Sequence, residues 1–356
     1  SRTMDRLDDG AIRLRSGRSV WQAGKAASDR VNSLPRAPQE LQADIAIVGA
    51  GITGAFLAER FTRMGRRVVV IDRREPAKGS TTASTAMLLW ELDASLLELE
   101  DRMGLERAGR VALRCRRQVA DIGALVNELG IACCFRERPS LYLAGNTLDA
   151  SDLREEKRLR AALGIDGQFL DEGDLAARGI MGTGALLYPG SADADPVQLA
   201  HGLMAAAIAR GGAVLSPATA EFYETAPDGV VVSTREGDVV RAHTLVLANG
   251  YEMPEFVPAA RHELVTSWAI ATAPEQAKHW RDMPLIWEAA DPYLYMRSTT
   301  DGRIIIGGED EAFADPDARE RMTPQKIAAL LAKAGARCPG LGDVEPEFAW
   351  SGVFGE

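Results

Sequence analysis

The sequence lacks the features that mark metal-binding, secreted and membrane-spanning proteins. It has only four cysteines and four histidines in 356 residues, with no C-x-x-C pair and no Cys and His spacing that forms a zinc site. No run approaches the roughly 20 consecutive apolar residues that span a membrane, and the first residues show no signal-peptide pattern. We therefore expect no metal, no membrane span and a cytoplasmic location.

An excess of basic residues is also lacking. The chain has 41 Lys and Arg against 51 Asp and Glu, which gives a net charge of -10. Binding to a phosphate backbone requires clustered Lys and Arg that displace counterions, so we expect no nucleic-acid partner. The content of 46% hydrophobic and 26% charged residues is ordinary for a globular protein, and the length suits two domains of roughly 100–200 residues each.

Apolar runs separated by helical patterns predict one sheet assembled from distant segments. Residues 45–48 and 68–71 are continuous apolar runs of the kind found in strands buried on both faces. Between them, residues 55–64 place apolar side chains close to helical spacing. Further strand-like runs follow at 213–215 and 244–248, the first preceded by a helix candidate at 199–209.

A glycine-rich turn, residues 49–54, lies between the first predicted strand and helix. In a G-x-G-x-x-G turn, Gly49 allows the tight turn, Gly51 lets the backbone approach a pyrophosphate, and Gly54 permits close packing of helix on strand. Phosphates would lie at the helix N-terminus, where unpaired N–H groups favour anions. Asp72 closes the second strand, where it is placed to accept hydrogen bonds from ribose hydroxyls. The turn predicts a dinucleotide, without separating FAD from NAD.

A loop rich in hydroxyl side chains, residues 79–87, follows Asp72 and Arg73. Small and hydroxyl residues that open a helix suit a second set of phosphate and ribitol contacts. A plain N-capped surface loop has the same composition, so both readings stay open at this point.

The regions between these segments predict a second domain. Residues 96–129 have amphipathic helical sequence, and residues 140–143 and 263–297 resemble half-buried strands. The predicted fold is α/β: a Rossmann-like FAD- or NAD(P)-binding domain with an inserted α+β substrate domain that contains a mixed antiparallel sheet. The predicted boundaries are an N-terminal extension at 1–42, the nucleotide domain at 43–95, 185–258 and 300–356, and the substrate domain at 96–184 and 259–299.

Five further motifs follow the hydroxyl loop in order along the chain. They are Tyr188-Pro189-Gly190 with Ala194-Asp195-Pro196, Leu245-Val246-Leu247-Ala248-Asn249-Gly250-Tyr251, Tyr293-Leu294-Tyr295-Met296-Arg297, Asp301-Gly302-Arg303-Ile304-Ile305-Ile306-Gly307-Gly308 and Trp350-Ser351-Gly352. Each is short, but their succession from about residue 44 resembles that of the D-amino-acid-oxidase-like FAD-dependent oxidoreductases. This superfamily includes glycine oxidase, sarcosine oxidase and glycerol-3-phosphate dehydrogenase.

The resemblance implies a bound FAD that extends across the nucleotide domain, with its ring at the domain interface. It also implies hydride transfer to flavin N5 from a C–H next to an amine nitrogen, in a small amine or amino-acid substrate. The expected cofactor-binding residues are Gly49, Gly51, Ile52, Thr53, Gly54, Asp72, Arg73, Ser80, Thr81, Thr82, Ser84, Thr85, Met87, Ala220, Ala248 and Gly250.

Three residues are the candidate catalytic residues: Arg297, Tyr251 and Tyr295. A guanidinium binds a carboxylate through two parallel hydrogen bonds, and the similar family position carries a basic residue in some members. The other reading of Arg297 is a surface arginine before a hairpin turn. Aromatic residues in these strands could form a pocket for an amine or simply belong to the core. Besides Tyr251 and Tyr295, the aromatic residues concerned are Tyr293, Trp268 and Trp287. His262 is a further candidate for the substrate site.

The sequence departs from the family pattern at two places. Residues 350–354 lack the basic residue of the family's W-x-G-x-R segment, because Val353 and Phe354 follow Gly352. This weakens the case for a carboxylate clamp and leaves amines, larger amino acids and uncharged substrates open. The printed chain also ends at Glu356, before the D-G-x-P-x-I-G segment that normally covers the flavin ring. We therefore expect this sequence to supply the residues that bind the adenine end of FAD more completely than those that cover its ring.

Two other functions fit parts of the sequence. An FAD-dependent dehydrogenase of a hydroxyl substrate, such as glycerol 3-phosphate, would need clustered basic residues near the ring, and Arg297 alone does not supply them. A nucleotide-binding protein without turnover would need only the glycine turn.

Overall fold

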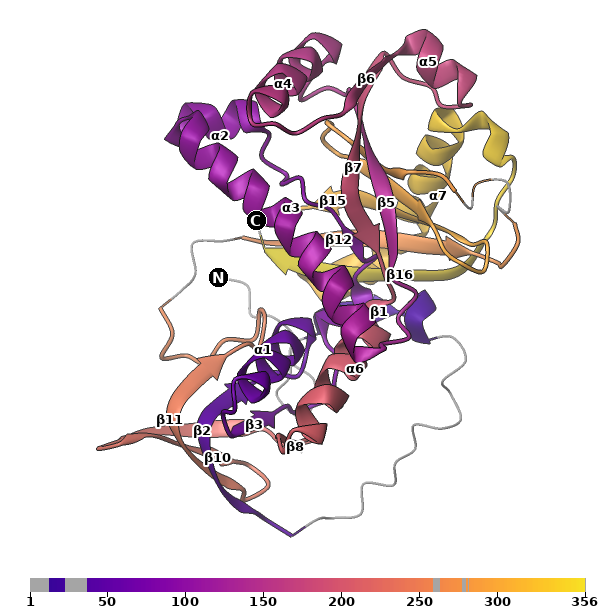
Figure 1. The fold of residues 1–356 in the computed structure, drawn as a ribbon. Helices are drawn as coiled ribbons and strands as arrows, with labels where there is room; N and C mark the ends of the chain where they lie inside the picture. Colours follow the sequence, from indigo (N-terminus) through magenta and orange to yellow (C-terminus); the bar gives the residue numbers. More distant parts are fainter. Residues whose placement is uncertain (1–12, 23–36, 259–262, 277–279, 281, 356) are drawn as a thin grey trace.

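The computed structural model describes residues 13–22, 37–258, 263–276, 280 and 282–355. Two sheets organise these residues, one of six strands and one of ten. In the view of Figure 1 the six-stranded sheet lies below and the ten-stranded sheet above. The expected α/β class, with a nucleotide-binding sheet and a second mixed sheet, is confirmed.

The six-stranded sheet is built from segments far apart in the chain. Its order is β8 (Ala213–Leu215), β3 (Val68–Ile71), β2 (Glu40–Val48), β11 (Val239–Leu247), β10 (Gly229–Thr234) and β9 (Ala220–Ala226). The first four strands run parallel, and β10 and β9 add antiparallel pairs. All four residues of β3 are buried, as the continuous apolar run predicts.

Two helices cover one face of this sheet. Helix α1 (Ile52–Arg63) begins directly after the glycine turn and connects β2 to β3. Helix α6 (Pro196–Ala209) begins with Pro196, and the Asp195 carboxylate accepts hydrogen bonds from the N–H groups of Val197 and Gln198. The two helices share one hydrophobic core with β2 and β3. This shared core holds α6 beside α1.

The ten-stranded sheet is mixed. Its main order is β1 (Arg15–Gly17), β16 (Pro346–Gly355), β12 (Leu264–Thr272), β15 (Ile304–Glu311), β14 (Leu294–Ser298), β13 (Leu285–Glu288), β5 (Arg136–Leu143), β7 (Gly184–Asp193) and β4 (Met87–Leu88), and β6 (Gln168–Asp171) also pairs with β7. All pairs are antiparallel except the parallel pair of β13 with β5.

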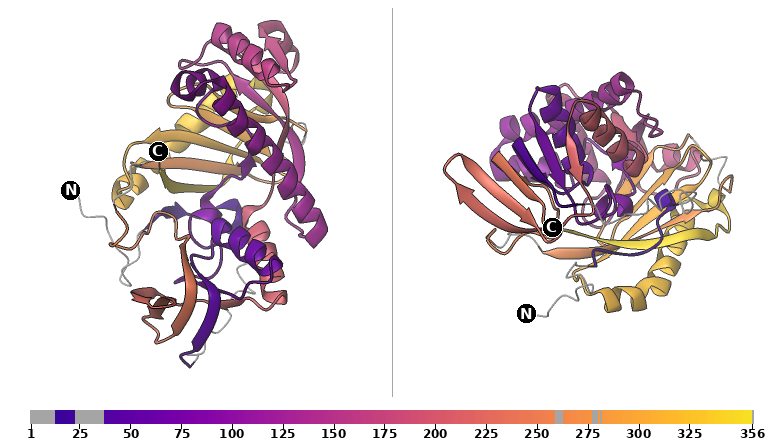
Figure 2. Two further views of the ribbon diagram at one scale, coloured as in Figure 1. Left: turned by 60° about the vertical axis from the view of Figure 1, so that its left-hand side comes forward. Right: turned by 90° about the horizontal axis from the view of Figure 1, so that it is seen from below.

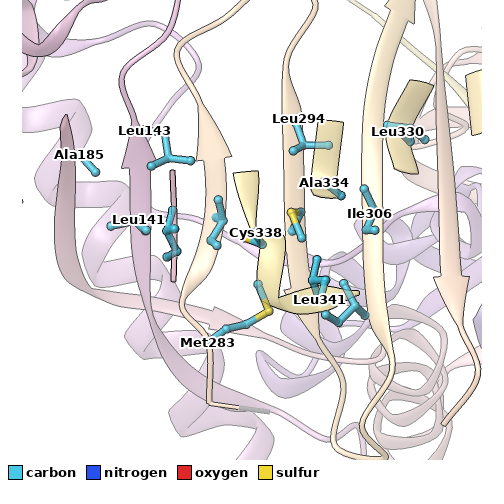
Figure 3. Close-up of a cluster of buried hydrophobic side chains, with 14 of the residues drawn as sticks. Leu141, Leu143, Ala185, Met283, Leu294, Ile306, Leu330, Ala334, Cys338 and Leu341 are labelled. Carbon is cyan, nitrogen blue, oxygen red and sulfur yellow. The ribbon is translucent and has the colours of Figure 1, made fainter. Parts of the chain in front are cut away.

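Helices cover both faces of the ten-stranded sheet. Helix α7 (Pro316–Arg337) packs on one face, where Leu330 and Ala334 meet Leu143, Leu294 and Ile306 (Figure 3). The other face lies towards α2 (Leu96–Met103), α3 (Leu105–Leu129) and α4 (Ala150–Ala162), which the right-hand view of Figure 2 shows opposite α7. A short helix, α5 (Glu172–Ala177), follows β6. Among the described helices, none combines the length and apolar character needed to cross a membrane.

Two segments lie elsewhere than the predicted boundaries place them. Residues 15–17, assigned to an N-terminal extension, form the edge strand β1 of the ten-stranded sheet, and Val20 is buried. Residues 300–356, assigned to the nucleotide domain, contribute β15 and β16, which both pair with β12. Strand partners far apart in the sequence decide sheet membership, and local composition does not reveal them.

Replacement of Leu294 by Ala tests the core between the ten-stranded sheet and α7. Leu294 is fully buried, so we expect the variant to lose about 2–5 kcal/mol of unfolding free energy. Leu113 on α3 is 44% exposed and is the matched control, for which Leu113→Ala should change stability by less than about 0.5 kcal/mol. Urea denaturation followed by tryptophan fluorescence measures both, and equal losses in the two variants would contradict this assignment of the core.

Candidate cofactor and substrate site

The glycine turn lies where the parallel strands of the six-stranded sheet end. Strands β2, β3 and β11 run in the same direction, so their carboxyl ends meet at one edge. The Gly49 N–H donates to the Ile71 carbonyl at 2.8 Å, and the Ala248 N–H donates to the Val48 carbonyl at 2.7 Å. Ligands of open α/β sheets bind outside this edge. The predicted residues Ala248 and Gly250 therefore lie beside the glycine turn.

At each glycine of the turn, an added Cβ atom would lie too close to neighbouring atoms. Gly49 has φ of +111°, and a Cβ atom there would lie 2.6 Å from the Ala248 carbonyl carbon. A Cβ on Gly54 would overlap the carbonyl oxygen of Gly49, because α1 crosses β2 closely at this point. A Cβ on Gly51 would lie 3.1 Å from the Thr81 hydroxyl oxygen. The turn is therefore a backbone cradle of the kind that admits a pyrophosphate.

The hydroxyl loop, residues 79–87, closes on the start of α1. Its 3-10 turn, Ser80–Ala83, brings the Thr81 hydroxyl to accept a hydrogen bond from the Ile52 N–H at 2.9 Å. Thr53, in the first turn of α1, is exposed, and the N-cap residue Gly51 has no side chain of its own to cap the helix. The two predicted phosphate-contact segments thus meet at one helix N-terminus, which fits the diphosphate of a dinucleotide.

Asp72 holds the glycine turn to the end of β3. Its carboxylate accepts hydrogen bonds from the Ala50 N–H at 2.6 Å and from the Arg74 N–H at 2.8 Å. Burial raises the pKa of Asp72, and these backbone donors oppose that effect. The ribose contact remains a prediction for this carboxylate, whose observed role is to fix the shape of the turn.

Beyond Asp72, two predicted cofactor-binding residues, Arg73 and Ala220, lie near the end of β3. The Arg74 guanidinium binds the Glu252 carboxylate through contacts of 2.8 and 3.0 Å, and Arg73 lies 3.7 Å from the same carboxylate. The Ala218 N–H donates to the Asp72 carbonyl at 2.7 Å, two residues before Ala220. Tyr251, predicted to be catalytic, precedes Glu252 in this turn. It thus belongs to the edge of the six-stranded sheet, whereas Tyr295 and Arg297 lie on β14.

The hydroxyl loop is also tied to the ten-stranded sheet. The indole N–H of Trp350 donates to the Ala83 carbonyl at 2.9 Å, and that of Trp21 donates to the Ser84 carbonyl at 2.7 Å. Strand β4, which contains Met87, pairs with β7. Sequence reasoning missed Trp21 because the first 42 residues were treated as an extension. Two tryptophans thereby position a loop whose own residues are too small to pack firmly.

One row of aromatic side chains crosses the face of the ten-stranded sheet that lies opposite α7. The strand register pairs Tyr142 with Trp287, Trp287 with Tyr295, and Tyr295 with Gly307. The rings of Tyr142 and Trp287 stack at 3.9 Å between centroids. Any side chain at Gly307 would collide with the Tyr295 ring, so this glycine makes room for the phenol. We call Tyr142, Trp287 and Tyr295 the aromatic row.

The aromatic row meets the hydroxyl loop at Tyr295. The side chains of Thr85, in the hydroxyl loop, and Ser267, on β12, lie close enough to the Tyr295 hydroxyl to lower its pKa. Burial raises the pKa of Tyr295 to about 12, so the phenol is neutral at physiological pH. A predicted cofactor residue therefore lies near a predicted substrate-side residue.

Arg297, the predicted carboxylate clamp, is paired within the protein. Its guanidinium pairs with Asp193 at 3.1 Å and donates to the Ala194 carbonyl at 3.0 Å. It is 2% exposed and lies 5.1 Å from the centre of the Trp21 ring. Burial lowers its pKa to about 10, whereas the neighbouring Asp193 acts in the opposite direction. Arg297 is thus a buried structural cation that locks β14 to β7.

The other predicted aromatic residues divide between the two faces of the sheet. Trp268 is 1% exposed, packs towards α7 and donates its indole N–H to Thr323 at 3.1 Å. Trp268 is therefore core and not pocket. Tyr293 lies beside Tyr295 with 5.7 Å between ring centroids. His262 lies outside the described residues.

Replacement of Gly54 by Ala tests the phosphate cradle. The added methyl group would collide with the Gly49 carbonyl, so we expect purified protein to hold at least ten-fold less FAD per chain than the unmodified protein. Gly335, on α7, has open space around its Cβ position and lies outside the predicted cofactor site, so Gly335→Ala is the matched control. Flavin absorbance per chain gives the result, and full flavin content in the Gly54 variant would show that the turn does not bind the cofactor.

Replacement of Arg297 by Met tests its structural role. Removal of one partner from a buried ion pair leaves an imperfectly compensated charge, although Arg136 also binds Asp193 at 2.6 Å. We expect the variant to lose about 3 kcal/mol of unfolding free energy, with no selective loss of affinity for carboxylate ligands. Chemical denaturation and ligand titration measure the two quantities. Unchanged stability with selectively weaker carboxylate binding would restore the clamp.

The sequence is similar to proteins from several bacteria. It is 25% identical over 239 residues to YhfW of Bacillus subtilis (strain 168), a match that covers 67% of this chain and 41% of that protein. It is 24% identical over 339 residues to OrdL of Rhizobium meliloti (strain 1021), covering 90% of this chain and 75% of that protein. The chain thus spans less than half the length of the first relative and three quarters of the second.

The fold is similar to that of glycine oxidase from Geobacillus kaustophilus. The crystal structure of that enzyme matches with a TM-score of 0.73 and 21% identity, covering 89% of this chain and 83% of that one. In sequence, the same enzyme is 25% identical over 327 residues, or 87% of this chain and 80% of its own length.

The DAO family model, described as FAD dependent oxidoreductase, matches residues 44–355. This span includes the glycine turn, the hydroxyl loop and the aromatic row. The glycine cradle at the start of α1 fits the diphosphate of FAD, as the family requires. The chain belongs to the DAO family of FAD-dependent oxidoreductases.

Proposed function

We propose that this protein oxidises a carbon–nitrogen bond of a small amine. The observation that carries the proposal is that the loop expected to hold FAD is tied to the ten-stranded sheet at Ala83 and Ser84, with Thr85 near Tyr295 of the aromatic row. A cofactor bound to the glycine turn and the hydroxyl loop would lie between the two sheets. The aromatic row would then form one wall of the substrate pocket.

The residues of the row suit an amine that reacts in its neutral form. Apolar rings favour the uncharged nitrogen, whose lone pair must be free when the adjacent C–H bond breaks. Tyr295 has a pKa of about 12 and stays protonated, so it orients groups by hydrogen bonding and does not act as a base at neutral pH. Close placement of the C–H bond is the main contribution required of the protein.

Bound FAD would supply the acceptor for a hydride from the carbon next to the nitrogen. The substrate loses two electrons and two hydrogens in total: the hydride goes to the cofactor, and the N–H proton goes to solvent. The nitrogen lone pair then completes a C=N bond. The resulting imine hydrolyses in water to a carbonyl compound and a free amine.

The charged residues near the aromatic row disfavour a phosphorylated hydroxyl substrate. A phosphate would need a cluster of arginines that are not already paired with acidic residues, but Arg297 and Arg136 both bind Asp193. Arg160, further along this face, binds Glu156 at 2.9 Å and lies 3.4 Å from Glu91. The similarity to glycine oxidase, whose name denotes an amine substrate, favours carbon–nitrogen oxidation.

Anaerobic mixing of the flavin-loaded protein with substrates tests the proposal. We expect loss of the flavin absorbance band near 450 nm, on the order of a full two-electron reduction, with at least one primary or secondary amine. Chemical reduction of the same sample supplies the reference for complete loss. Bleaching by polyols or their phosphates but by no amine would contradict the proposal.

A further inference from the structure

A bulge in β15 directs an acidic side chain into the region of the aromatic row. The register of β15 against β12 shifts between the pairs Trp268–Gly308 and Thr266–Glu311. Gly308 has φ of +132° and Glu309 has φ of +61°, both in the region that non-glycine residues rarely adopt. A bulge of this kind bends a strand and re-aims the side chains that follow it. Asp310 lies in this bulge, next to Glu309.

The neighbours of Asp310 show which way its side chain points. Glu309 lies 3.7 Å from Lys326 and also binds Lys333, and Glu311 lies 2.6 Å from Lys326. Both lysines belong to α7, which covers one face of the sheet. Successive side chains of a strand point to opposite faces, so Asp310 points away from α7. That is the face of the aromatic row.

The carboxylate of Asp310 lies next to two phenols. Tyr293 is half-buried, and its partial burial together with the nearby Tyr295 and Asp310 raises its pKa. Both carboxylate oxygens of Asp310 are shielded from solvent by the described residues. Because Tyr295 also lies near Thr85 of the hydroxyl loop, Asp310 belongs to the same enclosed region as the expected flavin edge.

A carboxylate at position 310 favours ligands of positive charge. A shielded carboxylate beside aromatic faces attracts an ammonium group and repels a carboxylate. The arginine that would have bound a substrate carboxylate, Arg297, is committed to Asp193. The charge of the described pocket residues therefore favours a cationic ligand over an amino-acid carboxylate.

We propose that Asp310, with Tyr293 and Tyr295, binds an ammonium group of the substrate that is not the nitrogen being oxidised. The second nitrogen is required because a carboxylate beside the reacting amine would favour its protonated form, which has no free lone pair. The substrate class is therefore an amine with a second cationic nitrogen, such as an α,ω-diamine. This inference rests on the proposed amine oxidation and adds the charge of the substrate.

Isothermal calorimetry on the FAD-loaded protein tests this site without turnover. The probe is tetramethylammonium, which cannot be oxidised by loss of a C–H next to a free lone pair, and tert-butanol is its uncharged analogue. We expect the protein to bind the cation at least ten-fold more tightly than the alcohol. Asp310→Asn should abolish that preference while the flavin content stays the same. Glu311→Gln removes the same charge one residue away, towards α7, and should retain the preference.

A substrate comparison completes the test. With unmodified protein, 1,5-diaminopentane should give a kcat/KM at least ten-fold above that of pentylamine. Equal affinity of the Asp310 variant and the unmodified protein for the cation would overturn the inference, and so would a preference for α-amino acids over diamines. If amines do not reduce the flavin but cation binding still depends on Asp310, the proposed function fails and the cation site stands.

Discussion

The hydrogen bond from the Ile52 N–H to the Thr81 hydroxyl, at 2.9 Å, connects the two halves of the site. Ile52 starts the helix that the glycine turn introduces, and Thr81 belongs to the loop that Trp21 and Trp350 hold against the ten-stranded sheet. The helix N-terminus, the hydroxyl loop and the aromatic row therefore have fixed relative positions. A long cofactor such as FAD requires this arrangement, because its ring lies at one end and its diphosphate lies a ribityl chain away, in the middle of the molecule.

On the face of the ten-stranded sheet that carries the aromatic row, Arg136, Arg160 and Arg297 are paired with acidic residues. Asp193 binds both Arg136 and Arg297, and the pairing is buried. Buried ion pairs contribute modestly to stability but fix geometry, here of β5, β14 and β7. Asp310, on the same face, adds a negative charge beside two neutral phenols. The electrostatics of this face thus differ from those of a site built around a carboxylate clamp.

The sequence predicted the parts of the fold that depend on local patterns. The glycine turn, α1 and the buried strands β2 and β3 follow from neighbouring residues, and the structure has them in place. Thr81 was a predicted contact residue because the hydroxyl composition of its loop is visible locally. The motif order along most of the chain was sufficient to identify the family, which the family model confirms.

Features that depend on partners distant in the chain were missed or misplaced. Strand β1 has three residues and is recognisable only by its pairing with β16. The same cause misplaced residues 300–356, because β15 and β16 reveal their sheet only through β12. Arg297 looks free in the sequence, since its partner Asp193 lies on another strand. Asp310 gave no local signal because its direction depends on the bulge in β15.

The central claim is that the glycine turn, the hydroxyl loop and the aromatic row form one FAD site. A crystal structure of the FAD complex tests it most directly. We predict diphosphate oxygens within about 2.7–3.2 Å of backbone N–H groups of residues 51–54, and a ring edge in contact with Thr85 or Tyr295. A diphosphate bound away from the glycine turn, or a flavin ring that does not reach the aromatic row, would contradict the claim.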